Sequence, residues 1–331
     1  MKIATRVSAE QLTTFRVGGV VETVVTIESS DEVREAIAFA QRTGAPVVPL
    51  GGGSNVLLPD GALATTVLRY APDTIRVVGT IITAHAGAVW DEVVRTSVLH
   101  GLRGIENLSG IPGTIGGALV QNIGAYGAVL SDTVLTVTAF DLLKHEWREF
   151  SARECAFGYR SSIFGATRDR WLITCVTLSL SRDAPLTLNY ADLRTQIQGD
   201  APELSTVRDA IMRIRRGKFP LLSEYGTAGS YFLNPIVTPE VAQVMTQRFP
   251  QMPTFLLPEG GIKVPLAWIL DHVLGLRGTV VNGVEVWRGQ SLVLAAHRGA
   301  TAAHVRQRAA QIASHVFTET RITITPEVRE L

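Results

Sequence analysis

The chain has 331 residues, of which 46% are hydrophobic and 18% are charged, and its formal net charge at pH 7 is +1. This composition is typical of a folded globular protein and argues against a disordered chain. The near-neutral charge argues against binding nucleic acid through phosphate neutralisation, and no apolar run reaches the roughly 20 residues of a membrane-spanning helix. The N-terminal residues lack the apolar core of a secretory signal, so we expect a cytoplasmic protein.

Only two cysteines are present, Cys155 and Cys175. Two cysteines in a chain of this length do not make a disulfide framework, and their spacing is not that of metal ligands. We therefore expect no metal site.

The first hundred residues alternate between strand and helix patterns. The β-branched run 20–28 and the short apolar run 46–50 predict strands, and 74–86 predicts a hairpin that turns at Gly79-Thr80. Apolar residues at helical spacing predict helices over 31–43 and 89–100.

A glycine turn, Gly51-Gly52-Gly53-Ser54-Asn55, follows the second strand. Successive backbone N–H groups in such a turn can form an anion-binding nest, to which the Ser and Asn side chains add donors. No G-K-[S/T] follows, which excludes a Walker A loop, and Val56 stands where the Rossmann fingerprint needs its third glycine. A simple β-turn is the alternative interpretation.

The segment Ser109–Gly127 holds six glycines and one proline among small apolar residues. It is too rich in glycine for an ordinary helix and too apolar for a solvated loop. Glycine allows positive φ and close approach of the backbone to a bound group. Two interpretations stay open on composition alone: a backbone cradle for a large ligand, or a tight buried crossover.

Further strands are predicted at 134–140, 147–150, 171–181 and 187–190, with a compact turn at 157–162. The later helices are predicted at 206–216, 239–248, 266–274 and 300–317, and the later strands at 291–296 and 321–331. In the last strand Pro326 favours an edge position. A composition change near 195–205 is the best candidate domain boundary, and a weaker one lies near 70–73.

Five motifs occur along the chain in a fixed order: G-x-G-S-N at 51–55, I-P-G…Q-N-I-G-A-Y-G at 111–127, F-G-Y-R-x-S at 157–162, G-S-Y-F-x-N-P at 229–235 and P-E-V-R at 326–329. Together they resemble MurB, the family of UDP-N-acetylenolpyruvoylglucosamine reductases of bacterial peptidoglycan synthesis. The resemblance runs from Thr14 to Arg329. The family often has Gly-Glu-Gly or Gly-Ala-Gly where this chain has three glycines.

The resemblance implies a mixed α/β and α+β fold. An FAD-binding domain of the vanillyl-alcohol-oxidase (PCMH) type would form two subdomains, 1–70 with the C-terminal strand 319–331, and 71–200. A separate α+β substrate-binding domain would occupy 201–318.

The resemblance also implies a reaction. NADPH would reduce bound FAD, and hydride would then pass from flavin N5 to C3 of the enolpyruvyl group of UDP-N-acetylglucosamine enolpyruvate. A proton delivered to C2 would complete UDP-N-acetylmuramate. We further expect a monomer, and the charge and the lack of a long apolar run lead us to expect no nucleic-acid or membrane partner.

By the family motifs, Ser230 would be the general acid at C2, and Arg160 and Glu327 would stabilise the enolate. An arginine suits a carboxylate because its planar fork is always charged, whereas Glu327 would need a raised pKa to act as a donor. Asn234, Lys218 and Glu327 are candidates to orient or polarise Ser230.

The FAD contacts implied by the motifs are Gly51, Gly52, Gly53, Ser54, Asn55, Ser109, Gly110, Ile111, Pro112, Gly113, Gly116, Gly117, Gln121, Asn122, Ile123, Gly124 and Tyr126. The implied substrate contacts are Tyr190, which is typical of the loop-bearing subtype, and Arg215, Lys218, Asn234, Lys263 and Gln290. Plainer interpretations stay open: Tyr190 as a core aromatic residue, Arg215 as part of a solvated face, and Gln290 as a turn residue.

Two other functional classes compete with this reading. An FAD oxidase of the same fold would use O₂, but it has no need of a proton donor beside an enolate. A non-catalytic flavin or nucleotide-sugar binding module would keep the glycine segments without the Arg, Ser and Glu residues, all of which are present here.

Overall fold

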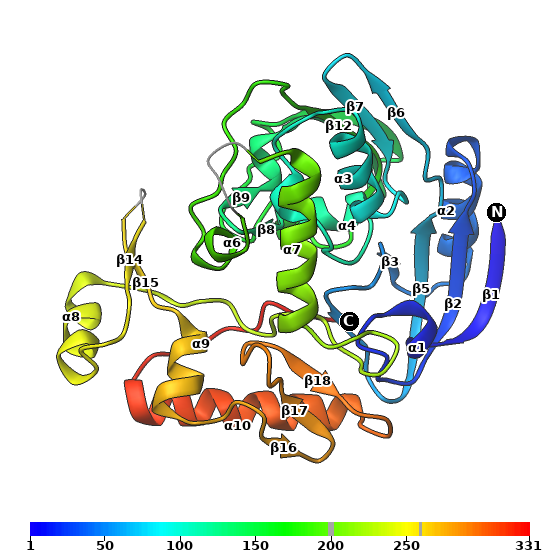
Figure 1. The fold of residues 1–331 in the computed structure, drawn as a ribbon. Helices are drawn as coiled ribbons and strands as arrows, with labels where there is room; N and C mark the ends of the chain where they lie inside the picture. Colours follow the sequence, from blue (N-terminus) through cyan, green and yellow to red (C-terminus); the bar gives the residue numbers. More distant parts are fainter. Residues whose placement is uncertain (198–201, 258–259) are drawn as a thin grey trace. The chain divides into compact units, whose positions relative to one another are not determined.

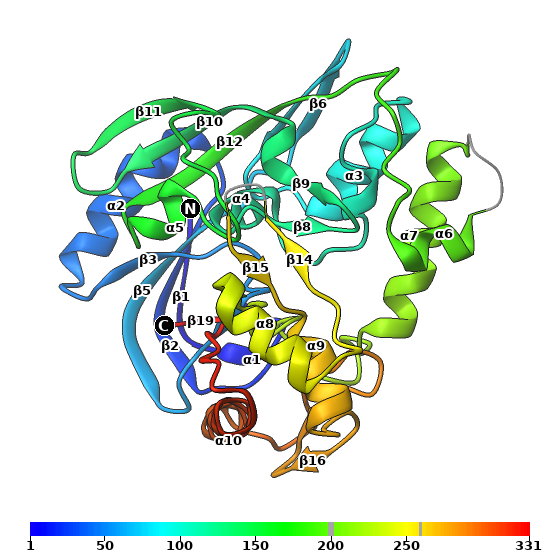
Figure 2. The ribbon, with the colours of Figure 1, turned by 90° about the vertical axis from the view of Figure 1, so that its left-hand side faces the viewer.

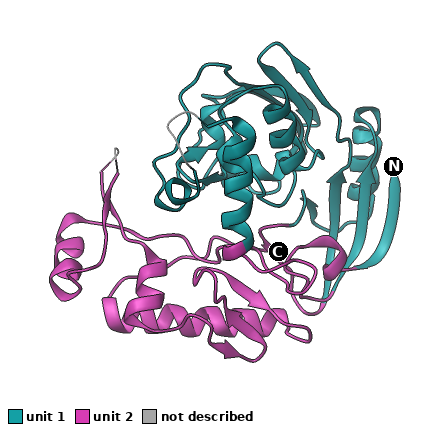
Figure 3. Cartoon of the chain, viewed as in Figure 1, with its two compact units in different colours: residues 1–7, 20–53, 62–216 teal, residues 8–19, 54–61, 217–331 magenta. Residues whose placement is uncertain are grey.

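The structure is a computed structural model that describes residues 1–197, 202–257 and 260–331. It divides into two compact units, which Figure 3 shows in different colours. Unit 1 comprises residues 1–7, 20–53 and 62–216, and unit 2 comprises 8–19, 54–61 and 217–331. The domain boundary expected between residues 200 and 201 lies outside the described residues, and the three-part division of the sequence analysis stays a prediction.

Unit 1 contains a four-stranded sheet in the order β1-β2-β5-β3 (Figure 1), formed by Lys2–Ser8, Val20–Ile27, Ala62–Tyr70 and Val47–Pro49. Strand β5 pairs in parallel with both β2 and β3. Helix α2 (Val33–Arg42), which a 3₁₀ turn at Ser30–Glu32 precedes, covers this sheet with its apolar face. The strands predicted at 20–28 and 46–50 and the helix at 31–43 are therefore confirmed.

A second sheet in unit 1 is antiparallel throughout, in the order β11-β10-β12-β7-β6. Its strands are Glu146–Ser151, Val134–Asp141, Trp171–Ser179, Ile81–His85 and Ile75–Val78. Figure 2 shows β10, β11 and β12 side by side. The hairpin and the strands predicted for these segments are confirmed.

One continuous apolar core joins the two sheets of unit 1. It contains Val25 and Leu68 from the first sheet and Val137 and Val176 from the second. Trp90, at the start of α3 (Trp90–Leu99), is fully buried in this core, and its indole N–H donates to the carbonyl of Leu108 at 2.9 Å. The shared core fixes the loops at the ends of both sheets with respect to one another.

The glycine-rich segment differs from its expected form, because residues Ile115–Val120 form helix α4. Glycine costs a helix roughly 1 kcal/mol per residue, but two features offset that cost here. The Thr114 hydroxyl caps the helix by accepting from the N–H of Gly117 at 3.3 Å. The N–H of Gly116 donates to the carbonyl of Ala86 at 3.0 Å, against which the helix packs closely.

The strand predicted at 187–190 is wrong. No strand is assigned there; the carbonyl of Thr187 accepts a hydrogen bond from the side chain of Asn107 at 2.7 Å rather than from a neighbouring strand. The strand predicted over 321–331 shortens to β19 (Arg329–Glu330), which pairs in parallel with β4 (Val56–Leu57). Unit 1 also holds the hairpin β8–β9 (Gly124–Ala125 and Ala128–Val129), helices α5 (Ile163–Ala166) and α6 (Ala191–Gln196), and all but the last two residues of α7 (Leu204–Lys218).

Unit 2 is built on small antiparallel sheets and one long helix. The sheets are β13-β15-β14 (Ile236–Val237, Ile262–Lys263, Phe255–Leu256) and β16-β17-β18 (Val280–Val281, Val284–Val286, Leu294–Ala296). The helices are α1 (Ala9–Leu12), α8 (Pro239–Arg248), α9 (Leu266–Trp268), which continues as a π-helical segment to Val273, and α10 (Ala302–Thr320). The helices predicted at 239–248, 266–274 and 300–317 are confirmed.

The start of α10 is held by a residue from the N-terminal part of the chain. The Asp60 carboxylate accepts from the N–H groups of Ala302 at 2.6 Å and Ala303 at 2.7 Å, which are unpaired donors in any helix. Thr301 and His304 add a capping box. This contact anchors residues 54–61 in unit 2. None of the helices in the described part of the chain is both long and apolar enough to cross a bilayer.

A partly buried ion pair joins α3 to α7 within unit 1. The two terminal nitrogens of the Arg208 guanidinium, Nη1 and Nη2, donate to the Asp91 carboxylate at 2.7 Å, and the N–H of Gly110 donates to the same group at 2.6 Å. Burial by itself would raise the pKa of Asp91, but these hydrogen bonds hold the pKa below its ordinary value. The carboxylate is therefore the form that stabilises the fold.

We predict that Asp91→Asn lowers the free energy of unfolding at pH 7 by about 1–3 kcal/mol, because it leaves a partly buried arginine with a weaker partner. Since the folded-state pKa lies below the unfolded value of about 3.9, the stabilisation is present above that pH and is lost as the pH falls towards the folded-state pKa. Urea unfolding followed by circular dichroism at pH 7 and near pH 3 measures both effects. The control is Glu92→Gln, which removes an exposed ion pair with Arg95 and should cost less than about 1 kcal/mol; an equal loss in both variants would contradict the assignment.

Candidate functional site

Two glycine-containing segments of unit 1 pack against each other with Thr114 as the side chain nearest to Gly51 at their contact. The turn Gly51–Gly53 follows β3, and it meets the start of α4. A Cβ atom on Gly51 would lie 2.9 Å from the Thr114 hydroxyl oxygen and 3.2 Å from Cα of Gly117. On the other side of the helix, a Cβ on Gly116 would lie 2.8 Å from Cβ of Ala86. The backbones of the two loops therefore approach as closely as glycine permits.

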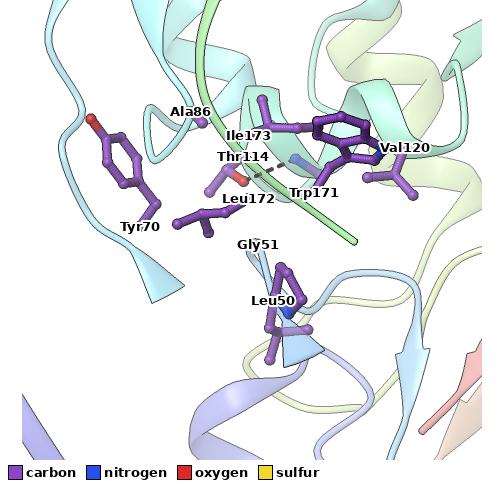
Figure 4. Close-up of a pocket in the computed structure, with 12 residues that line it drawn as sticks. Leu50, Gly51, Tyr70, Ala86, Thr114, Val120, Trp171, Leu172 and Ile173 are labelled. Carbon is purple, nitrogen blue, oxygen red and sulfur yellow. Dashed lines mark hydrogen bonds between the residues drawn. The ribbon is translucent and has the colours of Figure 1, made fainter. Parts of the chain in front are cut away.

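A pocket opens beside this contact (Figure 4). Its walls come from both sheets of unit 1 and from α4, and the lining residues are Pro49, Leu50, Gly51, Tyr70, Ala86, Thr114, Gly116, Gly117, Val120, Trp171, Leu172 and Ile173. Most of these side chains are apolar, whereas the glycine loops present only backbone. Apolar walls with a few placed polar groups are typical of cofactor pockets. The cradle that Cβ atoms would fill fits a dinucleotide such as FAD.

Thr114 is a site residue that the sequence reasoning missed. Its hydroxyl caps α4 and lies against Gly51, as the dashed line to the Gly117 nitrogen in Figure 4 indicates. Thr is one of the residues preferred at a helix N-cap. The glycine content of the segment argues against a helix and hides this signal.

The first part of segment 109–127 is held by side chains from elsewhere in unit 1. Ser109 is buried and its hydroxyl donates to the carbonyl of Glu106 at 2.6 Å. The carbonyl of Gly110 accepts from Nε of Arg215 at 3.0 Å. Burial lowers the pKa of Arg215, and Tyr126 and Asp91 oppose that shift. Arg215 is therefore part of a packed cluster rather than of a solvated face. Of the remaining predicted cofactor residues here, Ile111 and Gly113 are half-buried and Pro112 is exposed.

Tyr190 lies against Tyr126, with ring centroids 5.2 Å apart in an edge-to-face arrangement. Tyr190 is 43% exposed, whereas Tyr126 is buried. The interpretation of Tyr190 as a core residue is therefore wrong; its ring lies at the surface, at the start of α6.

Arg160 stands in a tight turn of unit 1, Gly158–Ser161, whose ends exchange backbone hydrogen bonds at 3.1 and 3.2 Å. Its guanidinium donates to the carbonyl of Gly124 at 2.6 Å. The motif residues 121–124 and 157–162 thus lie together in the structure. Gln121 and Ile123 are half-buried and Asn122 is buried.

Ser230 and Glu327 belong to unit 2, where the backbone brings them close. Ser230 forms an isolated bridge with Val293, and the N–H of Glu327 donates to the carbonyl of Tyr231 at 2.7 Å. Burial raises the pKa of the Tyr231 phenol to about 12, so this neighbour stays neutral at physiological pH. Ser230 and Glu327, the hydroxyl and the carboxyl predicted to act in catalysis, therefore lie on neighbouring segments of the backbone.

Asn55 also reaches this place in unit 2. Its side-chain amide donates to the carbonyl of Glu327 at 2.9 Å, and its carbonyl accepts from the N–H of Arg329 at 3.1 Å. The predicted nest is thereby divided, since Gly51–Gly53 belong to unit 1 and Ser54 and Asn55 to unit 2.

The predicted substrate residues of unit 2 have different surroundings. The Asn234 side-chain oxygen accepts from the N–H of Leu266 at 3.0 Å, and the Lys263 ammonium lies 5.4 Å from the centre of the Phe255 ring. Gln290 closes a turn in which its carbonyl accepts from the N–H of Val293, and the carbonyl of Lys218 packs against Gly289.

Comparison with known proteins assigns the chain to a family. Residues 21–144 match the model of an FAD binding domain, and residues 221–331 match the model of the C-terminal domain of UDP-N-acetylenolpyruvoylglucosamine reductase. A protein of that name from Pseudomonas aeruginosa is 40% identical over 89% of both chains, and one from Cupriavidus pinatubonensis is 38% identical over 91% of both. The chain belongs to the UDP-N-acetylenolpyruvoylglucosamine reductase family.

Membership makes the chain an FAD-dependent oxidoreductase, as the family resemblance of the sequence implied. A solved structure from Thermus caldophilus, the crystal structure of UDP-N-acetylenolpyruvylglucosamine reductase (MurB), is similar in fold. Its TM-score is 0.70, with 23% identity, over 100% of this chain and 99% of that one. The expected fold class, with an FAD-binding domain of the PCMH type and a second domain, is therefore confirmed.

We predict that Gly51→Ala weakens FAD binding at least about tenfold, because the new methyl group must push the Gly51 turn away from the backbone of Gly117. Titration of the apoprotein with FAD, followed by quenching of flavin fluorescence, measures the affinity. The control is Gly61→Ala, where a Cβ meets nothing within 4 Å. Equal affinities for FAD in the two variants would show that the contact between the loops does not shape the cofactor site.

Proposed function

We propose that this chain catalyses the NADPH-dependent reduction of UDP-N-acetylglucosamine enolpyruvate to UDP-N-acetylmuramate, a step in peptidoglycan precursor synthesis. The observation that carries the proposal is the 40% identity to a reductase of this name across 89% of the chain, which spans both units. The proposal includes action as a monomer in the cytoplasm.

The Gly51–Gly53 turn, segment 109–127 and the pocket beside them would hold FAD. When bound, FAD supplies the redox chemistry, taking hydride from NADPH and giving it to C3 of the enolpyruvyl group. The protein must then bind the substrate, stabilise the developing charge and deliver one proton to C2.

Arg160 would stabilise the negative charge that develops on the carboxylate side of the substrate. Placed donors that face a developing charge commonly supply the largest part of catalysis. The hydrogen bond from Arg160 to Gly124 supports this role, because it orients the guanidinium before substrate binds. Glu327 would contribute in its protonated form, as a hydrogen-bond donor to the same charge.

Ser230 would deliver the proton to C2. A serine hydroxyl is a weak acid, so a neighbour or a water molecule must restore its proton. The hydrogen bond from the N–H of Glu327 to the carbonyl of Tyr231 supports Glu327 as the group that restores the proton. This hydrogen bond brings the segment that carries Glu327 alongside Tyr231, the residue that follows Ser230. Asn234 and Lys218 are the other candidates.

The substrate would be held by Tyr190, Arg215, Lys218, Asn234, Lys263 and Gln290. Lysines and an arginine suit the diphosphate of the nucleotide sugar. The exposed ring of Tyr190 supports a covering role over the bound ligand.

We expect the purified protein to be yellow, to release flavin on denaturation, and to oxidise NADPH only when UDP-N-acetylglucosamine enolpyruvate is present. Absorbance at 340 nm with and without this substrate measures the reaction, and mass spectrometry identifies UDP-N-acetylmuramate. The proposed reaction would be refuted if NADPH were oxidised with formation of stoichiometric peroxide at a rate independent of the concentration of UDP-N-acetylglucosamine enolpyruvate.

We predict that Ser230→Ala leaves the reduction of flavin by NADPH nearly unchanged and slows the oxidation of reduced flavin by the substrate about 10²–10⁴-fold, the usual contribution of a general acid. Anaerobic stopped-flow absorbance separates the two half-reactions. Ser314→Ala makes the same change on the exposed face of α10 in the same unit and should alter neither. If Ser230→Ala slowed both half-reactions equally, a structural role would replace the proposed one.

A further inference from the structure

Arg160 has a backbone conformation that its side chain does not favour. Its φ is 51°, in the left-handed region, and it occupies the third position of the four-residue turn Gly158–Ser161. Glycine or asparagine is the usual residue where a turn requires positive φ. A residue with a Cβ loses roughly 1–2 kcal/mol there, so surrounding contacts must hold the turn in place.

Asn122 supplies one such contact. Its side-chain amide nitrogen donates to the carbonyl of Gly158 at 3.1 Å, and this carbonyl also closes the turn by accepting from the N–H of Ser161. Its side-chain oxygen accepts from the N–H of Ser131 at 2.9 Å. Asn122 is 5% exposed and is itself left-handed, with φ of 45°. The amide is therefore held at both ends and in one orientation.

The backbone around Asn122 holds the other end of the Arg160 side chain. The guanidinium donates to the carbonyl of Gly124 at 2.6 Å and approaches the carbonyl of Asn122 at 3.5 Å. A Cβ on Gly124 would lie 3.0 Å from Nη1 of Arg160, so the guanidinium packs directly on backbone. The hydroxyl of Ser162, the residue that follows the turn Gly158–Ser161, donates to the carbonyl of Val120 at 2.7 Å and so fixes the end of that turn.

We propose that Asn122 is a positioning residue that aims Arg160, in addition to any contact its backbone makes with FAD. Its side chain fixes the turn that carries Arg160, while the carbonyls of its own segment fix the guanidinium. The two left-handed residues thus form one preorganised support. This inference rests on the role proposed for Arg160 in charge stabilisation.

The test compares half-reactions in holoenzyme variants. Asn122→Gly keeps the positive φ but removes both side-chain hydrogen bonds, and Asn122→Asp keeps the acceptor for Ser131 but loses the donor to Gly158. Each should slow oxidation of reduced flavin by UDP-N-acetylglucosamine enolpyruvate about 10–100-fold, with reduction by NADPH and the KM for the substrate changed less than about threefold. Asn282→Gly is the matched control, since Asn282 is also left-handed, at φ of 50°, but lies exposed in the turn between β16 and β17. It should change none of these quantities.

A double-mutant cycle with Arg160→Met decides whether Asn122 acts through Arg160. If it does, Asn122→Gly slows the substrate half-reaction less than about twofold once Arg160 is gone. Losses that multiply in the double variant would overturn the positioning role while leaving the proposed function intact. No loss in Arg160→Met alone would instead refute the role proposed for Arg160. Binding of substrate to the oxidised variants, measured by calorimetry, gives a readout independent of turnover: under this inference Asn122→Gly adds no further change in affinity in the Arg160→Met background.

Discussion

The close approach of the turn after β3 to the start of α4 is the tightest constraint on the candidate site of unit 1. The turn after β3 meets the start of α4 at Gly51 and Gly117, where a single methyl group would come within 3.2 Å of backbone. One loop belongs to the parallel sheet, and the other packs on the antiparallel sheet through Ala86. The core that the two sheets share keeps both loops in register, and the pocket opens where they meet. Under the proposed function, FAD in this pocket would be bound mainly by backbone. The glycines at this contact would then be required because a side chain there would fill the space.

Much of this arrangement could be predicted from the sequence, because local periodicity determines most of the elements. The strands β2, β10 and β12 and the helices α2 and α10 follow directly from apolar spacing. Helix α4 could not be predicted from composition, since its stability comes from the Thr114 cap and from packing on Ala86. The strand predicted at 187–190 is wrong for a related reason. The composition of this segment is typical of a strand, but no strand pairs with it, and the carbonyl of Thr187 accepts a hydrogen bond from the Asn107 side chain instead.

The proposed site likewise contains residues that the sequence predicts and supporting contacts that it does not predict. The ordered motifs predict Arg160, Ser230 and Glu327 as catalytic residues through the family resemblance, but no sequence pattern reveals what holds these residues in place. Asn55 and Asn122 are predicted as groups that face the cofactor, and in the structure each side chain donates to a backbone carbonyl at or beside a proposed catalytic residue. An amide side chain can serve distant backbone in this way because it carries donors and an acceptor at fixed angles. Such long-range hydrogen bonds leave no trace in sequence periodicity.

The discontinuity of unit 2 has a consequence for the order of synthesis. Asn55 and the Glu327 carbonyl to which it donates are 272 residues apart. Because the ribosome adds roughly 5–20 residues per second, Glu327 is made on the order of ten to fifty seconds after Asn55. Leu57, buried in the finished unit, shares an apolar cluster with Phe15 and Val17, which are made before it, but most of that cluster comes from residues 228–328. The nascent chain therefore presents an apolar segment near its start whose cover is completed only by the last-made part of the protein. Under the proposed function, the enzyme becomes competent for catalysis only after the Glu327 segment has been translated, by which time the sheets of unit 1 have had time to fold.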